Sequence, residues 1–152
     1  TVKAMASVCL GAEKQRSINV SKYRINDIFE SISETVAMST MFAANHMKGM
    51  KAIIALTESG STPLLMSRLS SGLPIFSLSR HANTLSRCAL YRGVYPIHFD
   101  ESSEDIIKVS KIAIEQLKEQ GYLSKGDLVI LTHGDVFDQT GHTNTSKILK
   151  VS

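Results

Sequence analysis

The sequence has little of what marks several large classes of protein. It contains no long run of apolar residues, and a membrane-spanning helix needs about 20 of them, so no membrane span is expected. Lys and Arg are scattered instead of forming a block, and the net charge is only +3, so no nucleic-acid partner is expected. A modest positive field of this kind is compatible with small phosphorylated anions.

Cysteine is also scarce, since Cys9 and Cys88 are the two in the sequence. They form no CxxC motif and no Cys/His pair with zinc spacing, which argues against a metal site. Both lie in apolar, helix-like segments, so we expect reduced, buried thiols in a cytoplasmic protein. No signal-peptide pattern is seen. The chain opens at Thr1 in a helical pattern, which we interpret as the sign of a fragment.

The composition is otherwise that of one globular domain. The chain has 152 residues, of which 43% are hydrophobic and 20% charged. This length is typical of a single domain and allows a full hydrophobic core.

Apolar periodicity predicts an α/β fold. A helix is expected over residues 1–14, and a second runs from a cap at Ser31 or Ser33 to about residue 48. Strands and helices then alternate, which favours a mostly parallel sheet with helices on both faces. The connection before the last strand is too short for a helical crossover, so that strand is expected to be antiparallel. The predicted strands are 51–56, 74–78, 94–99, 127–131 and 146–151, and the helices between them are 63–71, 83–91 and 103–120.

The loop after the first strand of this unit is rich in hydroxyl groups. We call residues 57–62 the hydroxyl loop; Pro63 suits the first position of the next helix, and Thr62 suits its N-cap. Gly60 would let a ligand approach the backbone closely. The loop is not a P-loop, because the GxxxxGK[ST] spacing is absent. Two interpretations remain open, a cradle for a phosphate group or a turn that only caps a helix.

A second polar segment follows the fourth strand, over residues 133–144. His133, Asp135 and His142 raise the question of a metal or of catalysis, but their spacing fits no standard metal motif and no G-x-S-x-G motif occurs. We expect a hydrogen-bonding lip. If the first and fourth strands are neighbours, this segment and the hydroxyl loop meet at the point where strand order reverses. Arg80 and His81 follow the second strand; they either add a cation to that edge or lie in an exposed loop.

Several segments, in order, match a known family. They are KAIIALTESGSTP, GLPIFSLSR, LYRGVYPIHFD, GYLSKGDLVILTHGD and GHTNTSKILKV. Over essentially the whole chain the sequence resembles the C-terminal domain of pyruvate kinase, and it is most similar to bacterial enzymes activated by AMP or sugar monophosphates. Residues 1–15 resemble the last helix of that enzyme's catalytic barrel, and residues 16–152 resemble its regulatory domain.

The resemblance implies an architecture and a site. The expected fold is a three-layer α/β/α domain whose five-stranded mixed sheet has the order 3-2-1-4-5, with strand five antiparallel. The phosphate of an allosteric effector is expected in the hydroxyl loop, and residues 141–144 are expected to form the lip of the site. The residues so implicated are Thr57, Glu58, Ser59, Gly60, Ser61 and Thr62 of the loop, and Gly141, His142, Thr143 and Asn144 of the lip.

The sequence departs from relatives that bind a bisphosphate. Eukaryotic members carry a longer insertion after the third strand, with Trp and Arg around a second phosphate, whereas residues 100–105 here are few and acidic. A bisphosphate site of that design is therefore not expected. Glu58 stands where a neutral or basic residue is common, and it could repel a second phosphate or accept a hydrogen bond from a sugar hydroxyl.

The catalytic groups of the family lie in the barrel. The chain itself is therefore expected to hold no catalytic residue, no metal and no cofactor, while the parent enzyme uses magnesium and potassium and forms a homotetramer. The expected partners are the barrel and a sugar monophosphate or AMP. Two other interpretations are a small standalone α/β enzyme that uses His133, Asp135 or His142, and an assembly domain without a ligand.

Overall fold

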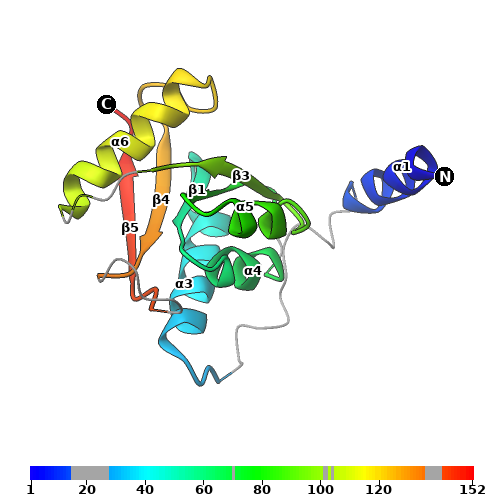
Figure 1. Cartoon of the computed structure of the whole chain (residues 1–152), viewed down its shortest axis with the longest axis horizontal. Coiled ribbons are helices and arrows are strands. Elements are labelled where there is room, and N and C mark those ends of the chain that lie inside the picture. The colour runs from blue at the N-terminus through cyan, green and yellow to red at the C-terminus, as the bar shows by residue number, and fades with distance from the viewer. Residues whose placement is uncertain (15–27, 70, 101–102, 104, 136–141) are drawn as a thin grey trace.

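The computed structural model describes residues 1–14, 28–69, 71–100, 103, 105–135 and 142–152. Helices and strands alternate after the first two helices, as Figure 1 shows. The elements in chain order are α1 (Val2–Glu13), α3 (Ile32–His46), β1 (Met50–Leu56), α4 (Ser61–Ser67), β2 (Ile75–Ser79), α5 (Ala82–Cys88), β3 (Val94–His98), α6 (Ile106–Glu119), β4 (Leu128–His133) and β5 (Thr145–Lys150).

The strands form one mixed sheet with the order β3-β2-β1-β4-β5. β1 is parallel to both β2 and β4, and β2 is parallel to β3. β5 runs antiparallel to β4, with His133 opposite Thr145. The predicted strand order and the reversed last strand are both confirmed. The carboxyl ends of β1 and β4 therefore lie side by side.

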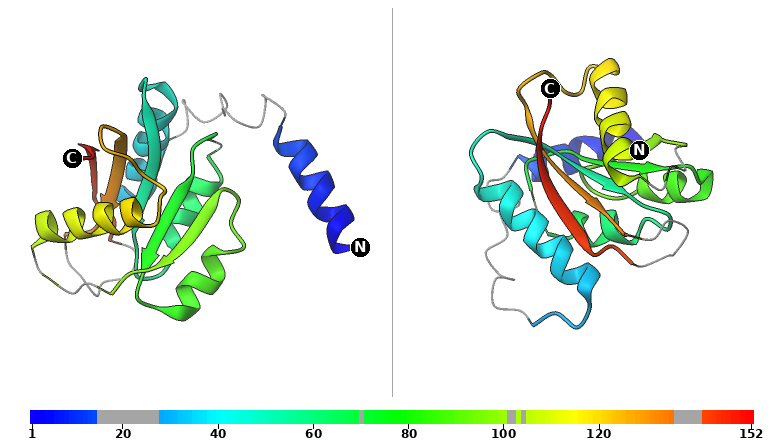
Figure 2. Two further views of the ribbon diagram at one scale, coloured as in Figure 1. Left: turned by 90° about the horizontal axis from the view of Figure 1, so that it is seen from above. Right: turned by 90° about the vertical axis from the view of Figure 1, so that its left-hand side faces the viewer.

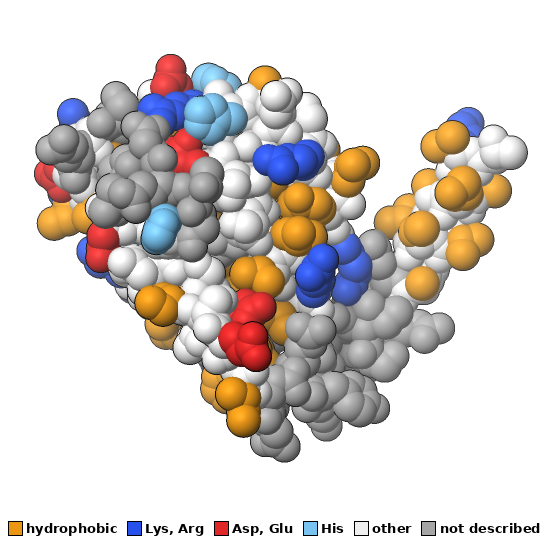
Figure 3. All heavy atoms as spheres, turned by 60° about the horizontal axis from the view of Figure 1, so that its bottom comes forward, with side chains coloured by type: hydrophobic (Ala, Val, Ile, Leu, Met, Phe, Trp, Pro, Cys, Tyr) orange, Lys and Arg blue, Asp and Glu red, His pale blue; other side chains and the backbone are white. Residues whose placement is uncertain are grey.

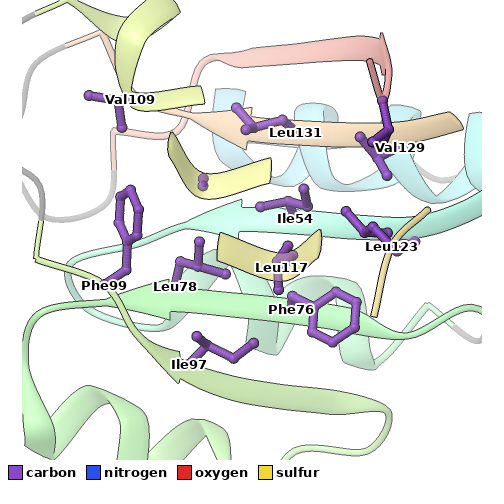
Figure 4. Packing of buried hydrophobic residues seen from close by; sticks show 13 residues of the cluster. Ile54, Phe76, Leu78, Ile97, Phe99, Val109, Leu117, Leu123, Val129 and Leu131 are labelled. Carbon is purple, nitrogen blue, oxygen red and sulfur yellow. The ribbon is translucent and has the colours of Figure 1, made fainter. Parts of the chain in front are cut away.

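Both faces of the sheet are covered, because side chains alternate between faces along each strand. On one face, Ile54 and Phe76 pack with Leu117 of α6, which is 0% exposed. Figure 4 shows these sheet side chains pointing toward that helix. On the other face, Ile53 packs with residues of α3 and α4, including Met41 and Met66. The views in Figure 2 show α6 on one side of the sheet and α3, α4 and α5 on the other. The three-layer prediction is confirmed.

The helix α1 differs from the rest, because its apolar side chains face solvent. Val2 is 79% exposed, Met5 is 68% exposed and Val8 is 72% exposed. Figure 1 shows α1 extending away from the sheet, and Figure 3 shows hydrophobic side chains along this helix. Cys9 on this helix is exposed while Cys88 is buried, so the prediction of a buried thiol was wrong for Cys9. Within the described ranges, no helix has the length and apolar character needed to cross a membrane.

Candidate functional site

The two polar segments singled out in the sequence come together at one edge of the sheet. β1 ends at Leu56 and β4 ends at His133, and these neighbouring strands are parallel. From β1 the chain continues to β2 on one side, and β4 lies on the other side. In open α/β sheets, ligands bind at the carboxyl edge where strand order reverses in this way.

The hydroxyl loop makes a tight turn at Gly60. The φ of Gly60 is +79°, and a Cβ at this position would lie 3.0 Å from the Sγ of buried Cys88. The Gly60 N–H donates to the Thr57 hydroxyl at 2.9 Å. The hydroxyls of Ser59 and Ser61 lie 2.9 Å apart. Glycine is therefore required here by both conformation and space.

One detail of the predicted loop was wrong. The N-cap of α4 is Gly60 and not Thr62, and no side chain caps the helix. The left-handed turn at Gly60 lets the helix begin at Ser61, so Thr62 and Pro63 fall inside its first turn. Thr62 is only 2% exposed, and its Oγ1 lies 2.5 Å from the Oγ1 of Thr143.

That hydroxyl pair links the hydroxyl loop to the predicted lip. The carbonyl of Thr143 also accepts a hydrogen bond from Ser33 of α3 at 3.2 Å. His142 is exposed, and the Asn144 side chain donates to Asp135 at 2.8 Å. Of the predicted lip residues, Thr143 thus contacts the loop, whereas Asn144 bonds to the segment that follows β4. Gly141 lies outside the described residues.

Gly134 explains how the segment after β4 packs. A Cβ on this residue would lie 2.7 Å from the carbonyl oxygen of His142, so a side chain would collide with backbone. The Asn144 N–H donates to the His133 carbonyl at 3.2 Å, which holds the two sides of the segment together. The close approach places Thr143 where it meets Thr62.

A charged group lies beside the hydroxyl loop on the β2 side. The Nε2 of His81 is 2.5 Å from the Oε2 of Glu58, and the Nε of Arg80 is 3.6 Å from the same oxygen. Both residues therefore lie beside the hydroxyl loop, and His81 is also exposed to solvent there. The sequence did not indicate that Glu58 would be their partner.

Two further contacts with the loop were not predicted from the sequence. The Thr84 hydroxyl donates to the Glu58 carbonyl at 2.7 Å, and Arg87 donates to the Ser59 carbonyl at 3.0 Å. Both residues belong to α5, and their spacing of three places them on one helical face. That spacing was visible in the sequence, but its target depends on β2 lying beside β1.

The residues of the alternative enzyme hypothesis form no catalytic arrangement in the described structure. Asp135 accepts hydrogen bonds from Asn144 and Thr145, and the Nδ1 of His133 lies 3.2 Å from the Gly134 carbonyl. Among the described residues, neither side chain forms a hydrogen bond or ion pair with His142. Across the described ranges, no group of three or more His, Cys, Asp or Glu side chains is placed to hold a metal ion.

A groove of about 430 Å³ lies at the opposite edge of the sheet, where β2 and β3 begin. It is bordered by the carboxyl end of α4, through Met66 and Ser67, and by Pro74 and Tyr95. α4 therefore has its first residues in the hydroxyl loop and its last ones at this groove. None of the predicted site residues lines it.

Comparison with known proteins agrees with this architecture. The family described as "Pyruvate kinase, alpha/beta domain" matches residues 34–149. The chain is 56% identical over 151 residues to pyruvate kinase II of Salmonella typhimurium, covering 99% of this chain and 31% of that protein. It is 63% identical over 134 residues to pyruvate kinase of Haemophilus influenzae, covering 88% of this chain and 28% of that protein.

A more distant relative is pyruvate kinase of Thermotoga maritima, which is 32% identical over 151 residues and is covered over 31% of its length. The chain thus spans about a third of the length of the curated relatives it matches. With the sheet order and the family match in agreement, the chain belongs to the pyruvate kinase alpha/beta domain family.

Proposed function

We propose that this chain is the regulatory domain of a cytoplasmic pyruvate kinase, which transfers a phosphoryl group from phosphoenolpyruvate to ADP in glycolysis. Proteins with that name are its relatives, and the chain corresponds to about a third of their length. In this proposal, residues 1–15 belong to the catalytic barrel and residues 16–152 form the regulatory domain. The barrel supplies the catalytic groups together with magnesium and potassium, and the enzyme is a homotetramer.

We infer that the domain binds a phosphorylated effector between the hydroxyl loop and the lip. The observation that carries this proposal is the contact between Thr62 and Thr143, because it brings the two segments together at the edge where ligands bind. The hydroxyls of Thr57, Ser59 and Ser61 lie in the same turn, and each can rotate to donate to a phosphate oxygen.

The charges around the loop favour an anion with a single phosphate. Arg80 and Arg87 lie beside the loop and contribute positive potential. Glu58 offsets part of that potential, and a second phosphate close to its carboxylate would be repelled. A sugar monophosphate or AMP is therefore the effector that we propose.

Isothermal titration calorimetry with ribose 5-phosphate, glucose 6-phosphate and AMP tests this proposal. We expect at least one ligand to bind. The double substitution Ser59→Ala and Thr62→Ala should lower its affinity by about tenfold or more, since it removes the Ser59 hydrogen bond to a charged group and the Thr62 contact with the lip. Ser39→Ala is the control, because this exposed hydroxyl donates to the carbonyl of Thr35 within α3 and lies outside the proposed site.

Absence of binding for all three ligands would overturn the effector proposal and favour a purely structural assembly domain. The chain should also form no pyruvate from phosphoenolpyruvate and ADP. Measurable turnover would instead support a standalone enzyme, with His133, Asp135 and His142 as its candidate catalytic residues.

A further inference from the structure

The two carboxylate oxygens of Glu58 have different surroundings. Oε2 lies 2.5 Å from His81 Nε2 and 3.6 Å from Arg80 Nε. A carboxylate can only accept hydrogen bonds, so the His81 ring nitrogen is the donor. Within the described part of the chain, Oε1 has no hydrogen-bond donor, and it is not among the buried unpaired atoms. With the Glu58 side chain 22% exposed, one acceptor oxygen remains open to solvent beside the hydroxyl loop.

The position of this carboxylate is fixed from several directions. Its own backbone carbonyl accepts from Thr84 at 2.7 Å, and the next carbonyl, of Ser59, accepts from Arg87 at 3.0 Å. His81 is the N-cap residue of α5, so its backbone is set by the start of that helix. An acceptor that is already held in place loses little conformational entropy when a ligand binds.

Building on the proposed function, we propose that Glu58 Oε1 accepts a hydrogen bond from a hydroxyl group of the ligand, and that Arg80 and His81 are positioning residues that hold Oε2. The ligand class follows from the acceptor. A phosphate monoester with hydroxyl groups on its carbon skeleton, such as a sugar phosphate or the ribose phosphate of a nucleotide, supplies a donor. Inorganic phosphate contains no such sugar hydroxyl.

The proposal gives Glu58 a role that a purely structural ion pair lacks. If the ion pair of Glu58 with Arg80 and His81 only stabilised the loop, its loss would lower the affinity for every anion that binds there by the same factor. If Oε1 contacts a ligand hydroxyl, its loss lowers the affinity for the sugar phosphate relative to the affinity for inorganic phosphate. The ratio of the affinities for ribose 5-phosphate and inorganic phosphate therefore separates the two roles, because both ligands share the phosphate group.

The test is calorimetric titration of the 152-residue chain with both probes. We expect Glu58→Ala to lower the ratio of the affinities for ribose 5-phosphate and inorganic phosphate by about tenfold or more, the usual effect of losing a charged hydrogen bond. Removing the negative charge raises the potential at the phosphate group of both ligands alike, so the ratio is the quantity compared. His81→Ala should shift the ratio in the same direction but less, because Arg80 still faces Oε2. His81→Gln retains an N–H donor and should restore most of the ratio.

The matched control is Glu115→Gln on α6, whose carboxylate pairs with Lys118 at 3.0 Å and lies in an unrelated ion pair. It should change neither affinity. If Glu58→Ala fails to fold by circular dichroism, Glu58→Met carries the test, since it keeps the length of the side chain and removes both acceptor oxygens.

The outcomes distinguish this inference from the proposed function. If both probes bind and Glu58→Ala leaves the ratio unchanged, or weakens both probes equally, the inference is overturned and the proposed function stands. If neither probe binds the unaltered chain, and glucose 6-phosphate and AMP also fail to bind, the proposed function is overturned and the inference with it.

Discussion

At the scale of single residues, Gly60 is the position where conformation and space act together. Gly60→Ala places a side chain at a φ of +79° and 3.0 Å from the Cys88 sulfur, and the Thr84 methyl is also close at 3.4 Å. We expect a loss of about 2–4 kcal/mol in the free energy of unfolding, the sum of a left-handed backbone and overpacking. Urea unfolding followed by circular dichroism measures it.

Gly121→Ala is the matched control for this substitution. Gly121 has the same φ of +79°, but within the described part of the chain a Cβ there would have no atom within 4 Å beyond its sequence neighbours. Gly121→Ala should therefore lower the free energy of unfolding by only about 1–2 kcal/mol, the effect of the left-handed backbone alone. An equal loss for the two variants would show that Cys88 and Thr84 can move aside, and that the loop is less tightly packed against α5 than its distances indicate.

At the scale of helices and strands, the sequence was most informative where a short apolar run stood between turn residues. The run KAIIAL predicted a strand at 51–56, and β1 is Met50–Leu56. The same signals located the other strands to within a residue or two. For β2 and β4 the reason is burial on both faces, which favours apolar residues along the strand. The hydroxyl loop followed from its position after β1.

Contacts between distant segments were less accessible from the sequence. The pairing of Glu58 with Arg80 and His81 depends on β2 lying next to β1, and no local pattern signals which loop carbonyl α5 reaches. The N-cap was misassigned because Thr62 and Pro63 fit the ordinary start of a helix, whereas Gly60 allowed an earlier start. The exposure of Cys9 could not be read from periodicity, since an apolar stripe does not say whether a partner is present.

The link between α4 and the lip can be tested as an interaction between elements. Thr62→Val and Thr143→Val each keep the side-chain shape but remove one hydroxyl of a buried pair 2.5 Å apart. We expect each substitution to lower the free energy of unfolding by about 1–2 kcal/mol, since the remaining hydroxyl loses its hydrogen-bond partner. The double variant should cost less than the sum by about 0.5 kcal/mol or more, as for residues in contact.

A double-mutant cycle measures this interaction from the free energies of unfolding of the unaltered chain, the two single variants and the double variant. Thr35→Val on α3 is a control, because its hydroxyl bonds a carbonyl of its own helix and is exposed. Additive losses for Thr62 and Thr143 would contradict a direct contact, and with it the observation on which the effector site rests.

At the scale of the whole molecule, the core and α1 have opposite character. The buried apolar side chains of the sheet and of α3 to α6 form two clusters, whereas Val2, Met5 and Val8 are at least two-thirds exposed. Exposed apolar surface of this kind promotes association between molecules. Its removal should have little effect on the stability of the core. The two properties therefore predict separate effects when α1 is deleted.

Deletion of residues 1–14 should leave the free energy of unfolding of the α/β unit, measured in urea, unchanged within about 0.5 kcal/mol, because exposed surface residues contribute little to folding. The same deletion should lower the self-association seen by sedimentation velocity. Met5→Lys with Val8→Lys keeps the helix and interrupts its apolar stripe, so it should reproduce the loss of association. A clear fall in stability on deletion would instead mean that α1 packs on the domain in solution, and unchanged sedimentation would assign the association to another surface.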